Sequence, residues 1–341
     1  MVAKNLMLKV EDLSVSFKAR SGPIQAVRNV TFSIKPGEVV ALVGESGSGK
    51  STIGLALMRL LDDVKKLEIS GKIFLRSGES SALDLMDRSE REMREIRGNE
   101  IAMIFQEPMS SLNPIFTIKT QIVEAILTHQ NISRRDAYCR ALEMLKLLSI
   151  PDPEKCLSNY PHQISGGMRQ RVMIAMALSC EPCLLIADEP TTALDVTIQA
   201  QIVDIMKKLQ KRLGMSILFI THDLGLVSEI ADRVLVLYGG QVVEVGDVKA
   251  LFASPFMPYT QALLKSIPKL GCSELPNYRV EAIPGSVPDA SAFPNGCTFH
   301  PRCRHTVRNI CDVSEPILET VSNNRQVRCC RWFEIEKDCV S

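Results

Sequence analysis

The residues best placed to do chemistry form a glycine-rich loop between a short apolar run and a stretch with helical character. The loop consists of Gly44, Glu45, Ser46, Gly47, Ser48, Gly49, Lys50 and Ser51, followed by Thr52. In this pattern the glycines let backbone N–H groups turn toward a phosphate, Lys50 reaches the outer phosphates and Ser51 binds Mg²⁺. A chance glycine-rich turn would lack the flanking strand and helix, so the sequence predicts a site for a nucleotide polyphosphate with Mg²⁺.

An acidic pair follows a second apolar run, where a nucleotide site would need a carboxylate. The run covers residues 183–187, and the pair is Asp188 and Glu189. Asp188 is expected to hold Mg²⁺. Glu189 is expected to polarise the attacking water as a general base, a role worth roughly 10²–10⁴ in rate. A solvated Asp-Glu turn is common for any one such pair, but the phosphate-binding loop upstream favours the functional interpretation.

A serine-glycine turn forms a second candidate surface for an anion. Ser165, Gly166 and Gly167 shortly precede the helical run VMIAMAL, so they are expected at a helix N-terminus. One chain then carries two phosphate-binding surfaces. A head-to-tail dimer could use both surfaces if each loop were pressed against the partner's turn.

The elements that must position these residues follow from hydrophobic periodicity. Alternating apolar and polar residues over the first forty positions predict antiparallel strands. Short apolar runs at 39–43, 183–187 and 217–220 are typical of buried parallel strands. Helical spacing dominates residues 83–148, and we place an inserted helical subdomain at about residues 107–165.

Length, charge and hydropathy limit the possible classes of protein. With 341 residues, about two domains are expected, at residues 1–250 and 251–341, because proline and glycine become frequent near residue 250. A formal charge of +1 provides no global field that would attract nucleic acid. We find no run near the ~18 apolar residues that a membrane span needs and no secretory signal, so a cytoplasmic location is expected.

Together these motifs resemble those of the ABC ATPase family over about residues 6–250. Three further elements follow the family order: Gln106 in IFQEP, Ala193-Leu194-Asp195, and His222 in ITHD. The resemblance implies that Gln106 couples Mg²⁺ and the attacking water to a membrane subunit. It also implies that Asp195 shapes the dimer seam and that His222 contacts the γ-phosphate.

The implied fold is an α/β P-loop NTPase (RecA-like) core. An antiparallel β subdomain, the helical insertion and a small cysteine-rich C-terminal extension would complete it. Phe17 stands where the family stacks an aromatic side chain on adenine, which contributes about 1–3 kcal/mol per base. A phenylalanine packed in the strand core fits Phe17 equally well.

The amino-acid sequences of several motifs narrow the resemblance to one branch of the ABC ATPase family. FQEPMSSLNP and ADEPTTALDVTIQAQI resemble the ATPase subunits of dipeptide and oligopeptide importers, with nickel importers as close relatives. This implies ATP hydrolysis coupled to uptake of di- or oligopeptides; a nickel or other solute importer and a soluble non-transport ABC ATPase are the alternatives. The implied partners are a second ATPase subunit, favoured as a paralogue, two integral-membrane permeases and, indirectly, an extracytoplasmic solute-binding protein. The chain would then lie at the cytoplasmic face of the cell membrane and bind no nucleic acid.

The extension at 251–341 is rich in cysteine, mainly in the segment 297–330. Four of these cysteines are separated by five, seven and seventeen residues, namely Cys297, Cys303, Cys311 and Cys329. The spacing resembles the iron–sulfur motif of the same branch, and four thiolates are the ligands of a [4Fe–4S] cluster. Zinc or unligated buried thiols are the alternatives, and Cys330 could replace Cys329. Because this segment lies outside every ATP motif, we expect it to have a structural role.

Overall fold

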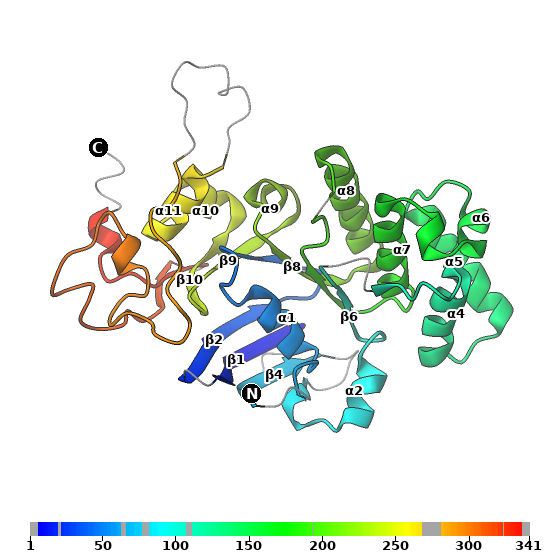
Figure 1. Cartoon of the computed structure of the whole chain (residues 1–341), viewed down its shortest axis with the longest axis horizontal. Helices are drawn as coiled ribbons and strands as arrows, with labels where there is room; N and C mark the ends of the chain where they lie inside the picture. The colour runs from blue at the N-terminus through cyan, green and yellow to red at the C-terminus, as the bar shows by residue number, and fades with distance from the viewer. Residues whose placement is uncertain are drawn as a thin grey trace, which may run out of the picture.

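The computed structural model contains two β-sheets and a group of helices (Figure 1). It describes residues 6–19, 22–62, 66–76, 82–106, 111–192, 194–267, 281–322 and 324–335. One sheet has four strands in the order β2-β1-β4-β5. The other has eight strands in the order β11-β12-β10-β9-β3-β8-β7-β6.

The elements have the following bounds. The strands are β1 (Leu8–Ala19), β2 (Gly22–Ile34), β3 (Val39–Val43), β4 (Leu67–Leu75), β5 (Leu83–Asp84), β6 (Ile101–Ile104), β7 (Leu184–Asp188), β8 (Ser216–Thr221), β9 (Arg233–Tyr238), β10 (Gln241–Asp247), β11 (Glu319–Ser322) and β12 (Arg325–Val327). The α-helices are α1 (Lys50–Leu57), α2 (Glu90–Ile96), α4 (Ile118–His129), α5 (Arg134–Leu147), α6 (Pro153–Ser158), α7 (Gly166–Leu178), α8 (Val196–Leu213), α9 (Leu224–Ile230), α10 (Val248–Ala253) and α11 (Pro258–Lys265). Short 3₁₀ helices are η1 (Leu85–Asp87), η2 (Pro161–Gln163) and η3 (His300–Arg302).

The four-stranded sheet follows the alternation of the N-terminal sequence. Strand β1 pairs antiparallel with both β2 and β4. Its side chains at Leu8, Val10, Leu13 and Val15 are buried in one core cluster. Alternation places Leu8 with Val10 and Leu13 with Val15, and the register shift between Val10 and Leu13 turns both pairs toward the same core.

The centre of the eight-stranded sheet is parallel. All five residues of β3 are buried, and β3 pairs in parallel with β8 and β9, while β7 pairs in parallel with β8 and β6. A strand covered on both faces needs a continuous apolar run. Strand β6 is a difference from the sequence prediction, because it lies inside the stretch expected to be helical. Its four buried residues are too few for periodicity to separate a strand from a helix.

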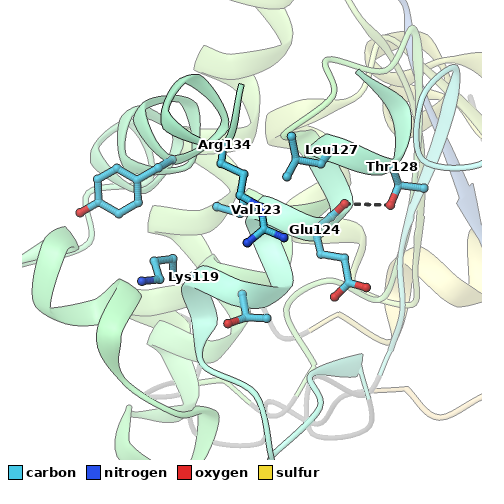
Figure 2. Close-up of a pocket in the computed structure, with 8 residues that line it drawn as sticks. Lys119, Val123, Glu124, Leu127, Thr128 and Arg134 are labelled. Carbon is cyan, nitrogen blue, oxygen red and sulfur yellow. Dashed lines mark hydrogen bonds between the residues drawn. The ribbon is translucent and has the colours of Figure 1, made fainter. Parts of the chain in front are cut away.

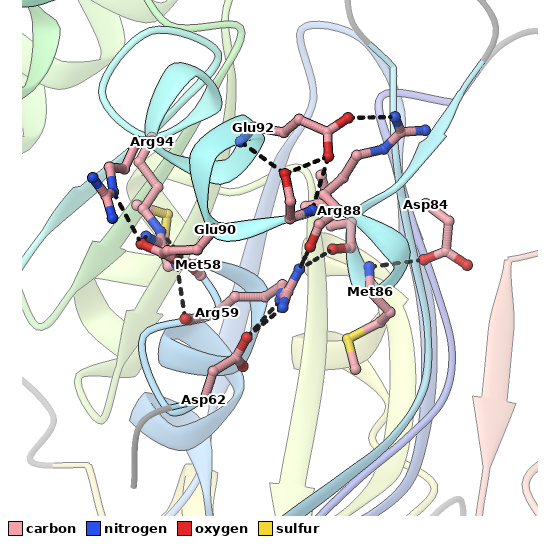
Figure 3. Close-up of polar contacts among 12 residues, drawn as sticks. Met58, Arg59, Asp62, Asp84, Met86, Arg88, Glu90, Glu92 and Arg94 are labelled. Carbon is pink, nitrogen blue, oxygen red and sulfur yellow. Dashed lines mark hydrogen bonds and ion pairs between the residues drawn. The ribbon is translucent and has the colours of Figure 1, made fainter.

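Arg59 fastens the end of α1 to the segment that follows β5, and a capped helix lies beside this contact (Figure 3). Ser89 and Glu92 form a reciprocal capping box at the start of α2, and hydrogen bonds from Ser89 lower the pKa of Glu92 to about 2. Arg59 Nε donates to Asp62 at 2.7 Å, and its Nη1 donates to the Leu85 carbonyl at 2.9 Å. These contacts fix the helix whose first turn carries Lys50.

Helices α4 to α7 lie together at one end of the molecule, far from the C-terminal residues (Figure 1). Ile118, Ile122 and Ile126 recur every four residues on α4 and are fully buried. They belong to one core cluster with residues of α5 and α7. No helix in the described ranges has the length and apolar content needed to cross a membrane.

The C-terminal extension joins the main sheet across the expected boundary at residue 250. Strand β12 pairs antiparallel with β10, where Glu244 faces Val327. Arg325 forms a 2.9 Å ion pair with buried Glu244, and its guanidinium lies 3.6 Å from the Phe256 ring centroid. Val327 is buried in a core cluster shared with β9 and α11. The extension therefore uses the apolar core of the larger fold.

Candidate nucleotide site

Four neighbouring parallel strands bring the predicted residues to one edge of the sheet. The glycine-rich loop follows β3, Asp188 ends β7, His222 follows β8, and Gln106 lies two residues beyond β6. These strands are adjacent in the order β3-β8-β7-β6. Because the carboxyl ends of parallel strands meet at the same edge, residues far apart in the sequence become neighbours there.

The loop requires glycine at specific positions. At Gly44, with φ +157°, an added Cβ would lie 2.2 Å from the Leu237 carbonyl oxygen. At Gly49, with φ +100°, it would lie 2.3 Å from the Ala26 carbonyl oxygen. Gly47 also has a positive φ, of +77°, but an added Cβ there would meet nothing within 4 Å. Gly44 and Gly49 are thus fixed by close approach of backbone, whereas Gly47 borders open space.

Lys50, Ser51 and Ser48 give the loop its polar interior. Lys50 Nζ donates to the carbonyl oxygens of Gly44 and Glu45, each at 2.9 Å. Burial lowers the pKa of Lys50. Ser51 Oγ donates to Asp188 Oδ1 at 3.0 Å. Ser48 Oγ is buried and has no hydrogen-bond partner in the part of the chain that the structure describes, so the loop retains an unused polar group.

Glu189 is the centre of a hydrogen-bond network at this edge. Gln106 Nε2 and Thr192 Oγ1 donate to its Oε2 at 3.1 Å and 2.9 Å. Its Oε1 lies 3.1 Å from His222 Nδ1. Burial raises the pKa of Glu189, but hydrogen bonds from His222 and Thr192 outweigh it, so the pKa is lowered overall. Burial raises the pKa of Asp188. The two adjacent carboxyl groups are therefore shifted in opposite directions.

The serine-glycine turn and Asp195 lie at helix N-termini. Ser165 Oγ accepts from the Met168 N–H at 3.4 Å at the start of α7. Asp195 Oδ1 accepts from the Ile198 N–H at 2.9 Å at the start of α8. An added Cβ at Gly166 would meet nothing within 4 Å. Between described residues, no hydrogen bond connects these two caps with the Lys50–Glu189 group.

The remaining predicted residues of the nucleotide site occupy less distinctive positions. Phe17 is half-buried in β1 and packs against the core cluster of the four-stranded sheet. Thr52 is half-buried in α1, and an added Cβ at Gly167 would lie 3.3 Å from Ile198. Ala193 lies outside the described residues.

Sequence reasoning missed two side chains that contact the loop from the C-terminal side. Arg302 Nη1 and Nη2 donate to Glu45 Oε2 and Oε1 at 2.7 Å and 3.0 Å. The Glu45 N–H donates to Tyr259 Oη at 2.9 Å. Tyr259 lies in the stretch SPFMPYT at residues 254–260, which resembles a P-x-H-P-Y-T segment of the importer branch with Met257 in place of His. Nothing in the sequence marks Arg302. A segment that lies outside every ATP motif in the sequence therefore contacts the glycine-rich loop in the structure.

The structure brings the predicted cysteines of the extension together around a small pocket of about 20 Å³. Cys297, Cys303, Cys311, Cys329 and Cys330 line it as free thiols. Burial raises the pKa of Cys297 to about 11 and that of Cys329 to about 12. Within the described residues, no three His, Cys, Asp or Glu side chains are arranged to hold a metal ion.

A larger pocket, of about 640 Å³, lies on the helical part of the molecule (Figure 2). Lys119, Glu124 and Leu127 of α4 line it together with Arg134 of α5. Thr128 Oγ1 donates to the Glu124 carbonyl oxygen at 2.8 Å beside it. None of the predicted site residues lines this pocket.

Comparisons with known proteins agree with this geometry. The family described as ABC transporter matches residues 27–192, and the oligopeptide/dipeptide transporter C-terminal region matches residues 243–311. A peptide import ATP-binding protein of Brucella abortus is 50% identical over 337 residues, covering 98% of this chain and 99% of the relative. The dipeptide transport ATP-binding protein of Escherichia coli is 48% identical, with 95% and 96% covered. A solved dimeric ATP-binding cassette with bound ADP and phosphate has a TM-score of 0.62 at 29% identity, covering 71% of this chain and 99% of its own.

Proposed function

Because the chain belongs to the family of ABC transporter ATP-binding proteins, we propose that it hydrolyses ATP to drive uptake of di- or oligopeptides. The observation that carries this proposal is the shared sheet edge, where Lys50 and Ser51 lie beside Asp188 and Glu189. The peptide class is supported by the match of residues 243–311 to an oligopeptide/dipeptide transporter region. It is also supported by relatives whose names specify peptide or dipeptide transport.

We propose that the glycine-rich loop holds the phosphates of ATP. The open space at Gly47 and the unpaired Ser48 hydroxyl fit a ligand with many acceptor oxygens. Ser51 and Asp188, already 3.0 Å apart, would hold Mg²⁺ together with Gln106. When bound, Mg²⁺ neutralises charge on the transferred phosphoryl group.

Glu189 is proposed as the general base, with Gln106 and His222 as its polar neighbours. Its lowered pKa keeps the carboxylate ionised at neutral pH, as a base must be. Its Oε2 accepts two hydrogen bonds, whereas Oε1 has one neighbour, His222, and so can accept a further hydrogen bond from water. The side chain of His222 is 62% exposed.

The membrane permeases are proposed to dock beside Gln106. An apolar groove of about 290 Å³ lies there, lined in part by Phe105, Met173 and Met176. Phe105 is 38% exposed and precedes Gln106 directly. A permease segment seated in this groove could move Gln106 and, through its 3.1 Å hydrogen bond, Glu189.

The second ATPase subunit is proposed to meet this chain at Ser165. Ser165 and Gly166 are exposed at the N-terminus of α7, where the helix dipole favours an anion. A solved relative is a dimer with ADP and phosphate, which supports a shared nucleotide site. We favour a paralogue as this partner, Asp195 at the seam, and a position at the cytoplasmic face of the membrane. An extracytoplasmic solute-binding protein would act only indirectly.

The extension is proposed to hold a [4Fe–4S] cluster. Cys297, Cys303, Cys311 and Cys329 supply the four thiols such a cluster needs and already share one pocket. We propose that residues 1–250 are the ATPase domain, with the helical insertion at about residues 107–165. Residues 251–341 are proposed as the extension, which pairs with the main sheet through β12.

The test of the proposed function is Glu189→Gln in the assembled transporter. Replacing the carboxylate by an amide of the same shape should retain ATP binding but lower hydrolysis by at least ~10², because the base is lost. Lys50→Ala provides the contrast, since it should weaken binding itself. Normal hydrolysis by Glu189→Gln would show that another group activates the water.

A further inference from the structure

The cysteine-rich segment reaches the phosphate-binding loop through a single arginine. Arg302 ends the 3₁₀ helix η3 and directly precedes Cys303. Its guanidinium holds both carboxylate oxygens of Glu45, the second residue of the loop, at 2.7 Å and 3.0 Å. This parallel, two-pronged geometry is the stronger and more directional form of an arginine–carboxylate pair.

Arg302 is fixed on several sides. Its side chain is only 5% exposed, whereas that of Glu45 is 24% exposed. Its Nε donates to the Pro284 carbonyl at 2.8 Å, and Nη1 also donates to Tyr238 Oη at 3.3 Å. The Phe299 ring centroid lies 6.0 Å from the guanidinium carbon. A side chain held in this way cannot follow Glu45 if the loop moves.

An aromatic cluster supports the same residue of the loop. Tyr238 and Tyr259 have ring centroids 4.6 Å apart, and Phe299 lies 5.2 Å from Tyr238 and 5.3 Å from Tyr259. Tyr259 Oη accepts the Glu45 N–H at 2.9 Å. Side chain and backbone of Glu45 are thus both held by residues outside the nucleotide motifs.

The negative charge of Glu45 is the reason why its contact with Arg302 should affect ligand binding. A carboxylate in a loop that holds phosphates repels the ligand, unless a cation neutralises the carboxylate and keeps it turned away. Lys50 is already engaged with the backbone carbonyls of Gly44 and Glu45. Arg302 is the cation placed on the carboxylate itself.

We propose that Arg302, assisted by Tyr259, is a positioning residue for ATP binding, acting through Glu45 from the C-terminal extension. This inference rests on the proposed ATPase function. Between described residues, no hydrogen bond or ion pair joins Arg302 to Glu189, so the loss of Arg302 should raise the KM for ATP much more than it lowers kcat. If the contact of Arg302 with Glu45 only anchored the extension, its loss would leave both the KM for ATP and kcat unchanged.

The test is a double-mutant cycle in the full-length chain, with MgATP affinity measured by equilibrium binding. Arg302→Met should weaken ATP binding by about tenfold, because Glu45 is left uncompensated beside the phosphates. Glu45→Gln in the Arg302→Met background should restore most of that loss, since the repelling charge is removed. The matched control is Arg308→Met, an exposed arginine of the same segment, which should bind ATP as the unaltered chain does.

Two results would overturn this inference. One is unaltered ATP affinity in a folded Arg302→Met chain, and the other is a double variant no better than Arg302→Met. If Arg302→Met does not fold, Arg302→Gln decides, because it keeps a polar side chain without the charge; wild-type affinity in a folded Arg302→Gln chain would equally refute the compensation of Glu45 by Arg302. Failure of the unaltered chain to bind MgATP would instead contradict the proposed function.

Discussion

The two sides of the phosphate-binding loop are built differently. On the side of β7 and β8, Asp188, Glu189 and His222 follow the ends of parallel strands. On the C-terminal side, Tyr259 and Arg302 hold the loop from α11 and η3. The first side is made of short motifs in neighbouring strands, and the second is made of single residues from separate segments. Recognisable motifs thus describe the reacting side of a site better than its support.

Exposure separates His222 and Gln106 on the first side from the C-terminal side, although Asp188 is itself buried. The His222 side chain is 62% exposed and Gln106 is exposed, whereas the Arg302 side chain is 5% exposed. The open side, next to β7 and β8, can bind a ligand and a partner subunit. The closed side, formed by Tyr259 and Arg302, can only support the loop residues that already pack against it. We therefore expect substitutions on the open side to change chemistry or assembly, and those on the closed side to change ATP affinity.

The largest effect is expected from blocking the surface that would meet the partner. Ser165→Arg should leave ATP binding to the isolated subunit intact but abolish ATP-dependent dimerisation, because a bulky side chain fills the space of the γ-phosphate. Size-exclusion chromatography with light scattering, with and without ATP, measures this. A dimer that still forms would argue against a nucleotide shared between two subunits at Ser165.

An intermediate effect is expected from substituting cysteines of the C-terminal extension, the segment that also carries Arg302. If the extension holds the proposed cluster, protein purified without oxygen should contain iron, and Cys303→Ser or Cys311→Ser should each deplete it, because a [4Fe–4S] cluster needs four thiolates. Cys180→Ser and Cys183→Ser are matched controls from the ATPase core and should keep the iron. Elemental analysis decides between the metals, since stoichiometric zinc without iron would contradict the cluster while leaving the ligands in place.

A smaller effect is expected from the hydroxyl that accepts the Glu45 N–H. Tyr259→Phe keeps the ring in its aromatic cluster but removes one hydrogen bond, worth about 1 kcal/mol. The KM for ATP should rise a few fold, with kcat nearly unchanged, in a steady-state ATPase assay. Tyr138→Phe, on α5, is a suitable control. An unchanged KM in Tyr259→Phe would restrict the support of the loop to Arg302.

The glycine-rich loop and the acidic pair beside it could be predicted from the sequence, because the residues of each motif are contiguous. The pattern Gly44 to Ser51 and the pair Asp188-Glu189 carry their mechanism in local spacing. Parallel strands also fix where they meet, since their carboxyl ends share an edge. The expected strand and helix on either side of the loop are present as β3 and α1.

The support of the loop could not be predicted, because it depends on tertiary pairing. Arg302 reaches Glu45 only because the extension packs beside β9 through Phe299 and Tyr238, a contact that no periodicity encodes. Strand β6 was missed for a related reason, since four apolar residues become a strand only when β7 is available as a neighbour. The ion pair of Glu244 with Arg325 likewise becomes apparent only after β10 and β12 pair.

Amide hydrogen exchange separates the two sides of the loop most directly. In the nucleotide-free full-length chain, Arg302→Met should accelerate exchange in peptides covering residues 44–49, because the grip on Glu45 is lost. Peptides covering β7 should exchange as before, and Arg308→Met should change neither region. If residues 44–49 exchange equally slowly in Arg302→Met and Arg308→Met, the extension does not support the phosphate-binding loop.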